Sequence, residues 1–331
     1  MSVRIVDGHV HILDPSWIPE GMRRAWARQG AGRRHPERDP EALLGRVAQG
    51  WRDPDGTLTI AAWDRAGVAG GVAPVVDWTI VGAPCGEHLP IRELNARNAE
   101  LARRHRGRYW FCAGIDPRHH DARTILDEAL ELDGCVGIKL YPAAGWDLAD
   151  PAHDWVYQVA HERGVPIVVH TAALGGDPLV TPASRPAALA PVMARHPEVT
   201  WVLGHAGFEA WWLEAVDVAT GWRRAFLDLS LWQHVAARDL RELRARVRVA
   251  VERVGAHRII FGSDIIRGPG EDPDGSRLVQ WIEWFRSLAE PFDGDPPVLS
   301  AEELELAMAG SAALAYGIEP EGEGDDGGHG R

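Results

Sequence analysis

Cysteine, long apolar runs and basic charge are all scarce in this chain of 331 residues. The three cysteines, Cys85, Cys112 and Cys135, have no spacing typical of a disulfide framework, which favours a reducing, cytoplasmic setting. No stretch approaches the roughly 18 apolar residues of a membrane helix, and we expect neither a secretory signal nor a membrane partner. The formal net charge is −13, which argues against nucleic acid as a partner because phosphate binding needs a basic surface.

The composition instead provides for one large domain. Hydrophobic residues make up 45% of the chain, enough for a sizeable core, and the length suits a β/α barrel with insertions. We expect this domain to span residues 1–318. The tail 319–331 is rich in glycine and acidic residues, and we expect it to be disordered.

Eight short apolar runs recur along the chain, each rich in β-branched or aromatic residues. A run that is apolar nearly throughout is typical of a strand covered on both faces, as in a parallel sheet. The runs are Ile5–Ile12, Val68–Val76, Tyr109–Ile115, Val136–Tyr141, Pro166–Thr171, Thr200–His205, Ala225–Leu231 and Arg258–Asp264.

Helical patterns lie between these runs, over 90–106, 121–132, 152–163, 184–195, 209–219 and 236–254, with two more near 277–289 and 301–316. Eight strands alternating with helices predict an α/β protein with a (β/α)8 TIM barrel. An open doubly wound sheet is the rival architecture. That fold usually has a glycine-rich phosphate loop after its first strand, whereas here the strand ends in Asp-Gly-His-Val-His.

A long segment, residues 13–63, follows the first predicted strand and contains several tryptophans and many arginines. In a barrel, the segment after a strand lies on the face that carries the active site. A loop of this length without a role is uncommon. We therefore expect an insertion that covers the active-site face or forms a subunit contact, for instance in a homodimer.

Two histidines, His9 and His11, end the first predicted strand. Residues two apart on a strand point to the same side, so the two imidazoles could hold one metal ion, although such a pair also fits two ordinary polar residues at a strand end. The residues at the other strand ends favour the metal site over the alternative of two ordinary polar residues. Strands five, six and eight end in His170, His205 and Asp264, at the barrel edge where active sites form. A buried carboxylate there is costly unless it is paired or bound to a metal.

These residues, with the segments VDGHVHI, GIKLYP, PIVVHT, LGHAG, LDLS and FGSD in that order, resemble the amidohydrolase superfamily. The segments are most similar to the amidohydrolase-related branch that contains aminocarboxymuconate semialdehyde decarboxylase. The resemblance covers residues 3–318 and implies a TIM barrel with a bound divalent metal. It does not specify the reaction, because the branch includes both hydrolases and decarboxylases.

The resemblance implies that His9, His11, His170 and Asp264 hold one divalent metal, zinc first and manganese second. Such a set leaves a coordination position open, and zinc held in this way lowers the pKa of its water to about 7. His205, outside the set, would hydrogen-bond that water or the substrate oxygen. Asp264 would also accept the water's proton. We therefore assign catalytic roles to His205 and Asp264.

The role of Lys139, at the end of the fourth predicted strand, stays open. Its segment resembles the dihydroorotase segment in which a carboxylated lysine bridges two metals, and His170 and His205 would then belong to the second metal. Members of the nearer branch mostly use one metal, and Lys139 would then bind a substrate anion or pair with Asp264. Asp7 is open in the same way, as a partner of the metal-binding histidines or as a turn cap.

Two departures from the branch bear on the reaction. Its decarboxylases often have an acidic residue soon after the histidine of strand six, but Glu209 comes one place later than expected, which favours hydrolysis. FGSD usually continues with an aromatic residue and a proline. Here Arg267 follows, either at the pocket rim, where it would bind a carboxylate, or as a solvated loop residue. We expect Trp232, Gln233 and Tyr141 to line the substrate pocket as well.

The first functional expectation is a metal-dependent hydrolase, in which metal-activated water attacks a carbonyl carbon and a C–N or C–C bond breaks. The substrate is expected to be a small molecule, aromatic or carboxylated. A non-oxidative decarboxylase is the second interpretation. A catalytically inactive barrel that acts as a binding protein is the third, and the intact set of ligand residues argues against it.

Overall fold

The fold is taken from a computed structural model of the chain, which describes residues 3–33, 35–81, 88–176 and 178–319. Cys85 and nearly all of the predicted disordered tail, residues 320–331, lie outside these residues. Eight parallel strands each pair with the next one in the sequence. The strands are β1 (Ile5–Asp7), β2 (Val68–Pro74), β3 (Tyr109–Gly114), β4 (Cys135–Leu140), β5 (Ile167–His170), β6 (Trp201–Gly204), β7 (Ala225–Asp228) and β8 (Ile259–Ile260).

The sheet curls until its first and last strands meet. Just past β1 and β8, the amide of Asp264 donates to the carbonyl of His9 over 2.7 Å. A parallel bridge between His11 and Ile266 continues the contact. The predicted TIM barrel is therefore confirmed, and the place where it closes carries three of the metal-ligand candidates.

Two layers of side chains fill the interior of the barrel. The lower layer is apolar and buried, and consists of Val6, Val72, Cys112, Val168, Val202, Phe226 and Ile260, with Gly137 paired to Cys112. Because side chains alternate across a strand, residues two places further along also point inward. They include the buried polar residues Lys139, His170 and Asp228 together with glycines 8, 114, 204 and 262.

The glycines of the upper layer make room for the polar side chains. A Cβ atom at Gly262 would lie 2.7 Å from Oδ1 of Asp228 and 2.9 Å from Cβ of His9. A Cβ atom at Gly204 would lie 3.5 Å from the ring of His9. The glycine of the FGSD segment is therefore explained by the space that the histidine and the aspartate occupy beside it.

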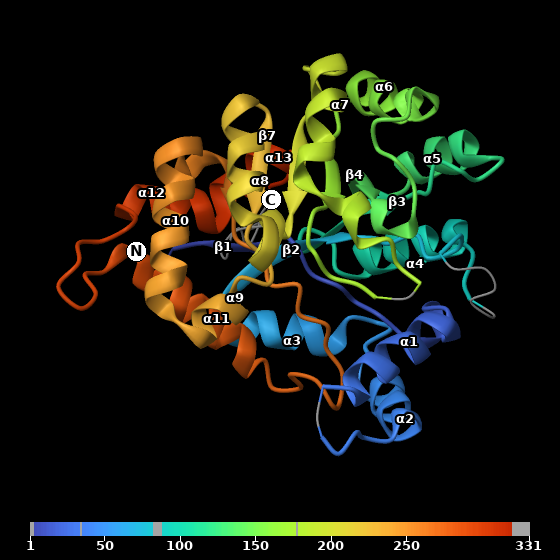
Figure 1. Cartoon of the computed structure of the whole chain (residues 1–331), viewed down its shortest axis with the longest axis horizontal. Coiled ribbons are helices and arrows are strands. Elements are labelled where there is room, and N and C mark those ends of the chain that lie inside the picture. The colour runs from blue at the N-terminus through green and yellow to red at the C-terminus, as the bar shows by residue number, and fades with distance from the viewer. Residues whose placement is uncertain (1–2, 34, 82–87, 177, 320–331) are drawn as a thin grey trace, which may run out of the picture.

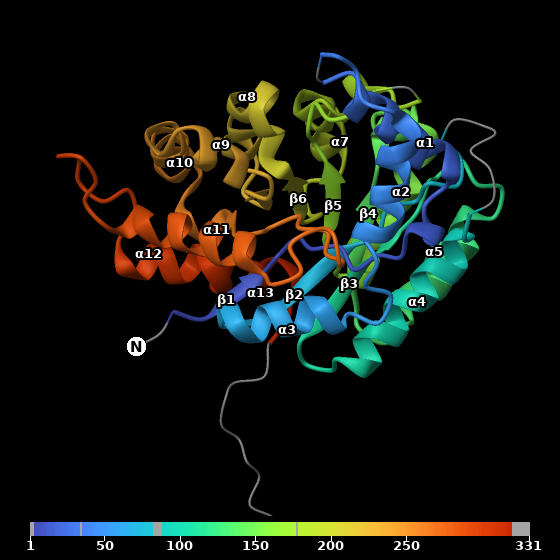
Figure 2. The ribbon, with the colours of Figure 1, turned by 90° about the horizontal axis from the view of Figure 1, so that it is seen from below.

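Helices between the strands cover the outside of the barrel (Figures 1 and 2). They are α3 (Thr57–Ala66), α4 (Ile91–Arg104), α5 (Ala122–Leu130), α6 (Asp154–Arg163), α7 (Ala190–Arg195), α8 (Phe208–Gly221), α9 (Gln233–Arg238), α10 (Leu240–Val254), α11 (Ser276–Arg286), α12 (Ala301–Glu305) and α13 (Ser311–Tyr316). The stretch predicted as one helix over 236–254 is divided, because the side chain of Asp239 caps α10. Among the described residues, no helix has the length and apolar character needed to cross a bilayer.

The segment 13–63 forms a helical pair ahead of α3. Helices α1 (Glu20–Ala31) and α2 (Pro40–Gly50) pack against each other and lie beside the barrel, outside its ring of helices (Figures 1 and 2). Trp26 on α1 contacts Trp51, with ring centroids 5.6 Å apart, and Trp78 in the loop after β2, at 5.5 Å. These aromatic contacts hold the insertion against the end of the barrel that carries the strand-end histidines.

Candidate metal centre

The first two ligand candidates lie just beyond β1. We predicted this strand to extend to Ile12, but its ladder ends at Asp7, so His9 and His11 belong to the segment that follows. Nε2 of His11 lies 3.2 Å from Oδ1 of Asp264, and Nε2 of His9 lies 3.8 Å from the same oxygen. The two imidazoles therefore face one carboxylate.

Asp264 reaches this position through an uncommon backbone conformation. Its φ angle is 51°, in the left-handed region, where a residue other than glycine carries a strain of about 1–3 kcal/mol. The preceding Ser263 is held by Asp7, whose carboxylate accepts from the amide of Ser263 (2.8 Å) and from its hydroxyl (2.6 Å). Asp7, whose role the sequence left open, thus supports the segment that carries Asp264.

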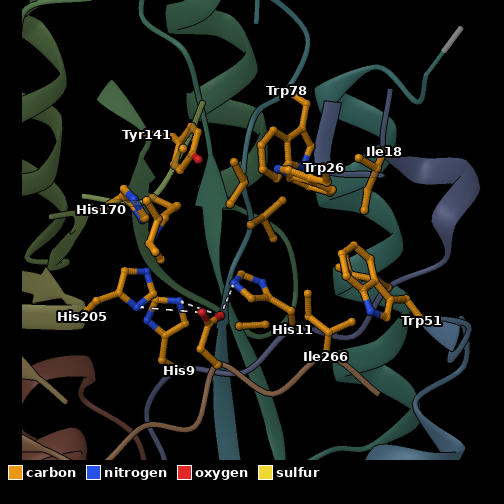
Figure 3. A pocket seen from close by; sticks show the side chains of 18 of the residues that line it. His9, His11, Ile18, Trp26, Trp51, Trp78, Tyr141, His170, His205 and Ile266 are labelled. Carbon is orange, nitrogen blue, oxygen red and sulfur yellow. Dashed lines mark ion pairs between the residues drawn. The ribbon is translucent and has the colours of Figure 1, made fainter. Parts of the chain in front are cut away.

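The other two histidines join the same group (Figure 3). His170 ends β5, and His205 begins a tight turn after β6 with a φ angle of 65°. The ring centroid of His205 lies 4.8 Å from that of His170 and 4.6 Å from that of His9. Nδ1 of His205 is 2.8 Å from the hydroxyl of Ser230 and 3.9 Å from Oδ2 of Asp264. All five residues proposed from strand ends are therefore close together.

Asp228 orients His9, although it was not among the predicted site residues. It ends β7 and is fully buried. Its Oδ2 hydrogen-bonds to Nδ1 of His9, and its Oδ1 accepts from the amide of Ser230 over 2.8 Å. A hydrogen bond at Nδ1 leaves the lone pair of Nε2 free for a metal. The sequence did contain a signal, since LDLS ends the seventh strand at the same edge of the barrel.

The donor atoms suit a divalent metal. His9, His11 and Asp264 each offer one atom, and these atoms lie within 4.8 Å of one another. Within the described part of the chain, the buried Nε2 atoms of His9 and His170 have no hydrogen-bond partner. A buried polar atom without a partner is costly, and a cation that takes up these lone pairs would remove the cost. Three of the four predicted ligands thus converge, and His170 presents a free nitrogen to the same cavity.

Burial favours the neutral forms of His9, His170 and His205. It lowers the pKa of His9 and His170 well below the usual value, and the positive charge of Lys139 adds to this effect. Burial by itself would raise the pKa of Asp264, but the hydrogen bond from His11 and the positive charges nearby outweigh it, so this pKa is lowered. Neutral imidazoles and an ionised carboxylate are the forms that bind metals.

Lys139 lies on β4, is 1% exposed and lines the same cavity. Burial lowers its pKa to about 8, although the carboxylates of Asp228 and Asp264 oppose the change. Throughout the described ranges, no carboxylate comes within ion-pair distance of its amine. The pairing with Asp264 that the sequence allowed is therefore not formed.

A cavity of about 440 Å³ connects this cluster to the insertion. The histidines and Asp264 line one end of it, and Trp26, Trp51 and Trp78 gather at the other (Figure 3). Tyr141 lies between them, with its ring centroid 5.2 Å from that of Trp78 and 4.8 Å from that of His170. Residues of the 13–63 segment that line the cavity are Leu13, Ile18, Trp26, Gln29, Arg33 and Trp51.

A sequence model of the amidohydrolase family matches residues 6–318. The chain belongs to the amidohydrolase family. The match covers almost all of the barrel and confirms the resemblance carried by the strand-end motifs. The cluster that could hold a metal lies at the carboxyl ends of the strands, where TIM barrels form their active sites.

Several solved structures share the fold. An amidohydrolase from Burkholderia multivorans with bound zinc has a TM-score of 0.63 at 18% identity, over 96% of this chain and 100% of that one. A 5-carboxyvanillate decarboxylase from Novosphingobium aromaticivorans, complexed with manganese and 4-hydroxy-3-methoxy-5-nitrobenzoic acid, has a TM-score of 0.64 at 13% identity, over 95% and 96%. A 2,6-dihydroxybenzoate decarboxylase complexed with 2,6-dihydroxybenzoate has a TM-score of 0.61 at 15% identity, over 95% and 98%. The comparison with curated proteins found no match.

Among the predicted substrate-binding residues of this amidohydrolase-family protein, Tyr141 lines the cavity, whereas Trp232 and Gln233 lie behind its wall. Trp232 is fully buried, and its Nε1 donates to the carbonyl of His205 over 3.0 Å. Gln233 donates to the carbonyl of Ser263 over 2.6 Å. Both side chains therefore support the backbone beside site residues instead of facing a ligand.

Arg267 also differs from its prediction, because it is fully buried instead of lying at the pocket rim. Its guanidinium pairs with Asp272 over 3.1 Å, and both side chains are shielded from solvent. The next residue, Gly268, packs against the backbone of Gly50 in the insertion. Arg267 thus fastens the segment after Asp264 and does not contact the cavity.

His119 and Asp77 join the loops after β3 and β2, next to Trp78. Nε2 of His119 lies 2.9 Å from Oδ2 of Asp77, and Oδ1 of Asp77 accepts from the amide of Thr79 over 2.9 Å. The hydrogen bond to Asp77 raises the pKa of His119. Burial would raise the pKa of Asp77, but the hydrogen bonds from His119 and Thr79 outweigh it, so this pKa is lowered. The pair fixes the loop that carries Trp78 into the cavity.

This pair should stabilise the fold most at mildly acidic pH. The contribution of His119 is present below its ordinary pKa of 6.5 and is lost as the pH rises through its raised value. The contribution of Asp77 is present above its ordinary pKa of 3.8 and is lost as the pH falls. His119→Gln should therefore lower the free energy of unfolding by about 1 kcal/mol near pH 5.5 and by less near pH 8.5. Urea unfolding of both proteins measures this, with the exposed His120→Gln as control, and an equal loss at both pH values would contradict the ion pair.

Proposed function

We propose that this protein is a metal-dependent non-oxidative decarboxylase of a small aromatic carboxylic acid. The observation that carries the proposal is the wall of the cavity, where a metal-ligand cluster faces an end lined by Trp26, Trp51 and Trp78. Aromatic side chains bind flat rings through offset stacking and edge contacts. A ring can therefore be held by the insertion while the group to be removed lies beside the cluster.

The charges around the cavity also fit an anionic substrate. The chain as a whole carries −13, yet the charged groups that line the cavity, histidines aside, are Lys139, Arg33 and Asp264 among the described residues. Asp264 already faces His11. The remaining positive charge, increased by a divalent metal, favours a carboxylate in a chain that is otherwise acidic.

This choice reverses the order expected from the sequence, where hydrolysis came first. That order rested on the place of Glu209 in the chain, but Glu209 pairs with Arg238 outside the cavity. Two of the solved structures with this fold are decarboxylases of aromatic acids, which supports the same choice.

His9, His11, Asp264 and His170 would hold the metal, which supplies a positive charge that binds substrate oxygens and stabilises negative charge on them. In the reaction, the carbon–carbon bond to the carboxylate breaks, carbon dioxide leaves, and the electron pair stays on the carbon and takes up a proton. In this reaction Asp264 would accept a proton from a substrate hydroxyl group. The tryptophan wall keeps water from the ring, which favours the conversion of a charged carboxylate into neutral carbon dioxide.

We propose zinc as the resident ion and manganese as the second choice, because a mixture of imidazole and carboxylate donors suits zinc and accepts manganese. Elemental analysis of protein purified without chelator should find one divalent ion for each chain. Protein that lacks stoichiometric metal and binds none on reconstitution would contradict the proposal.

A hydrolase is the second candidate, and the observation that favours it is the carboxylate of Asp264 beside Nε2 of His11 and Nε2 of His9. An ionised carboxylate beside the metal position can accept the proton of an attacking water. The two candidates differ in their products. Metal-loaded protein incubated with hydroxylated benzoic acids should release carbon dioxide as the acid disappears. If the protein instead hydrolyses lactones or cyclic amides and releases no carbon dioxide from any acid, the decarboxylase proposal is wrong and the hydrolase proposal is supported.

Trp26→Ala should weaken substrate binding more than it affects chemistry. The ring contacts Trp51 and Trp78 in the cavity wall, so its loss removes part of the surface that holds the substrate ring. We expect KM for an aromatic acid to rise about tenfold, equivalent to about 1.4 kcal/mol, with kcat within about threefold and metal affinity unchanged. Trp222→Ala, between α8 and β7 at the opposite end of the barrel, is the control. A KM that shifts equally in both variants would refute the assignment.

A further inference from the structure

The turn that follows β6, residues 205–208, presents His205 to the cavity with an uncommon backbone conformation. All four residues have positive φ angles, which are 65° at His205, 42° at Ala206, 73° at Gly207 and 44° at Phe208. Of these residues, the glycine alone adopts such angles without steric cost. Backbone strain of this kind persists only where the surroundings hold it, and it gathers at functional sites. The contacts that hold this turn therefore bear on the position of His205.

Hydrogen bonds from three other elements hold the turn by its peptide groups. After β5, the hydroxyl of Thr171 accepts from the amide of the third residue of the turn over 3.2 Å. Before α9, Nε1 of Trp232 donates to the carbonyl of His205 over 3.0 Å. On α10, Nη1 of Arg246 donates to the carbonyl of Phe208 over 3.2 Å. The first, third and fourth residues of the turn are thus each bound by a buried side chain.

Arg246 connects two of these contacts. Its guanidinium carbon lies 5.3 Å from the ring centroid of Trp212 and 6.0 Å from that of Trp232, within the range of cation–π contacts. Its Nη2 binds the carboxylate of Glu242, one helical turn earlier, so its charge is balanced although the side chain is buried. The same arginine therefore binds the last carbonyl of the turn and packs on the indole that binds the first.

We propose that Arg246 is a positioning residue for His205, an inference that rests on the proposed function and on the catalytic role of His205 in it. Arg246 is not among the described residues that line the cavity, so it acts through the turn. By binding the turn directly at one end and through Trp232 at the other, it keeps the imidazole where Nδ1 lies 2.8 Å from the hydroxyl of Ser230. Without Arg246, the strained backbone relaxes toward commoner angles and the ring leaves this position.

The first test is a double-mutant cycle that joins Arg246 to His205. Arg246→Met should lower kcat about 10- to 100-fold, because a displacement of about 1 Å at a reacting group costs a rate factor of this size. The affinity for metal should not change, since the proposed ligands do not include His205. In a His205→Asn background, the same substitution should have little further effect on kcat. An equal loss of kcat in both backgrounds would overturn the proposal, because it identifies a general effect on the fold.

Arg244→Met is the matched control on the same helix. Arg244 is buried, donates to three backbone carbonyls between residues 287 and 296, and has its guanidinium carbon 5.3 Å from the ring centroid of Phe292. It makes the same kinds of contact as Arg246, but with a segment other than the turn. Its loss should lower the melting temperature and leave kcat within about threefold of the parent. A kcat that falls equally in the two methionine variants would overturn the proposal.

A second variant keeps the test decisive if the first does not fold. Glu242 retains its ion pair with Arg238, at 2.8 Å, when Arg246 is replaced, so Arg246→Met leaves no carboxylate unpaired. If that variant is unfolded, Arg246→Lys enters the same cycle. Lysine keeps the positive charge beside Glu242 but lacks the planar fork that binds a carboxylate and a carbonyl together. Its kcat should also fall, and only where His205 is present. A parent-like kcat would overturn the proposal.

The position of His205 can also be followed without turnover. In protein labelled at histidine with an NMR-active nitrogen isotope, the Nδ1 resonance of His205, assigned with His205→Asn, should shift in Arg246→Met and not in Arg244→Met. An unchanged resonance in Arg246→Met would overturn the proposal. The two hypotheses fail separately. Hydrolysis without carbon dioxide contradicts the decarboxylase and leaves the cycle to be measured on the hydrolytic rate, whereas carbon dioxide release with additive effects contradicts the role of Arg246 alone.

Discussion

Asp264→Asn is expected to reduce turnover by about 10²–10⁴-fold while the barrel stays folded. Asp264 lies 3.2 Å from Nε2 of His11 and 3.8 Å from Nε2 of His9, and in the proposed function it would be both a metal ligand and the carboxylate that accepts a proton. Asparagine keeps the shape and one oxygen, but it is not a base and carries no charge for the metal. The loss is expected for either candidate reaction, because a substrate hydroxyl or an attacking water would give its proton to the same group.

Turnover, metal content and melting temperature of this variant, measured together, show whether activity is lost while the fold and the metal are kept. Asp116→Asn is the control, since Asp116 is another buried carboxylate, pairs with Arg118 after β3 and is not among the residues that line the cavity. His205→Asn should also be slow, and its effect need not add to that of Asp264→Asn, because both residues act at one site. An Asp264→Asn protein that binds metal and turns over within a few-fold of the parent would leave the site without its proposed base.

Asp228→Asn is expected to weaken metal binding by about 10–100-fold. The carboxylate of Asp228 accepts a hydrogen bond from Nδ1 of His9, which directs the lone pair of Nε2 toward the metal position. The amide group of asparagine can rotate and donate to Nδ1 instead. The ring proton would then move to Nε2, where it blocks the ligand atom. The carboxylate of Asp228 also accepts a hydrogen bond from the amide of Ser230. The hydroxyl of Ser230 contacts Nδ1 of His205, so the substitution should also affect the position of His205.

Metal affinity is measured by titrating the metal-free proteins with zinc in the presence of a competing chelator. Asp77→Asn is the matched control, since Asp77 is a buried aspartate that binds a histidine, His119, away from the cluster. It should lose stability and keep the metal affinity of the parent. Equal metal affinity in the parent and in Asp228→Asn would show that His9 needs no orienting carboxylate.

The barrel could be predicted from the sequence because its signals are local. Each strand is an apolar run that the chain repeats at regular intervals, and each run is separated from the next by a helical pattern. The ends of the strands were less certain. The ladder of β1 stops at Asp7 and that of β8 at Ile260, since the backbone then turns, with Asp264 in a left-handed conformation that apolar patterning does not reveal.

The substrate-binding predictions show where local signals fail. Trp232, Gln233 and Arg267 each follow a strand end, yet their side chains bind backbone or a neighbouring aspartate instead of facing the cavity. Position after a strand places a residue at the right end of the barrel. It does not determine the direction of a side chain in a turn, because that direction depends on φ and ψ and on the partners within reach.

The sequence by itself determined that the chain forms a β/α barrel and that His9, His11, His170, His205 and Asp264 meet at one end of it, because the carboxyl ends of parallel strands share one edge. Only the tertiary structure decided how these residues are held. The hydrogen bond that orients His9 joins it to Asp228, 219 residues away, and Ser263 is bound by Asp7 across 256 residues. Such pairs arise from strand register and barrel closure, which bring distant residues within hydrogen-bond distance. They produce no periodic pattern in the sequence from which they could be predicted. The tertiary structure likewise placed Lys139, the one lysine, in the cavity that the insertion covers, where no carboxylate of the described residues lies within ion-pair distance.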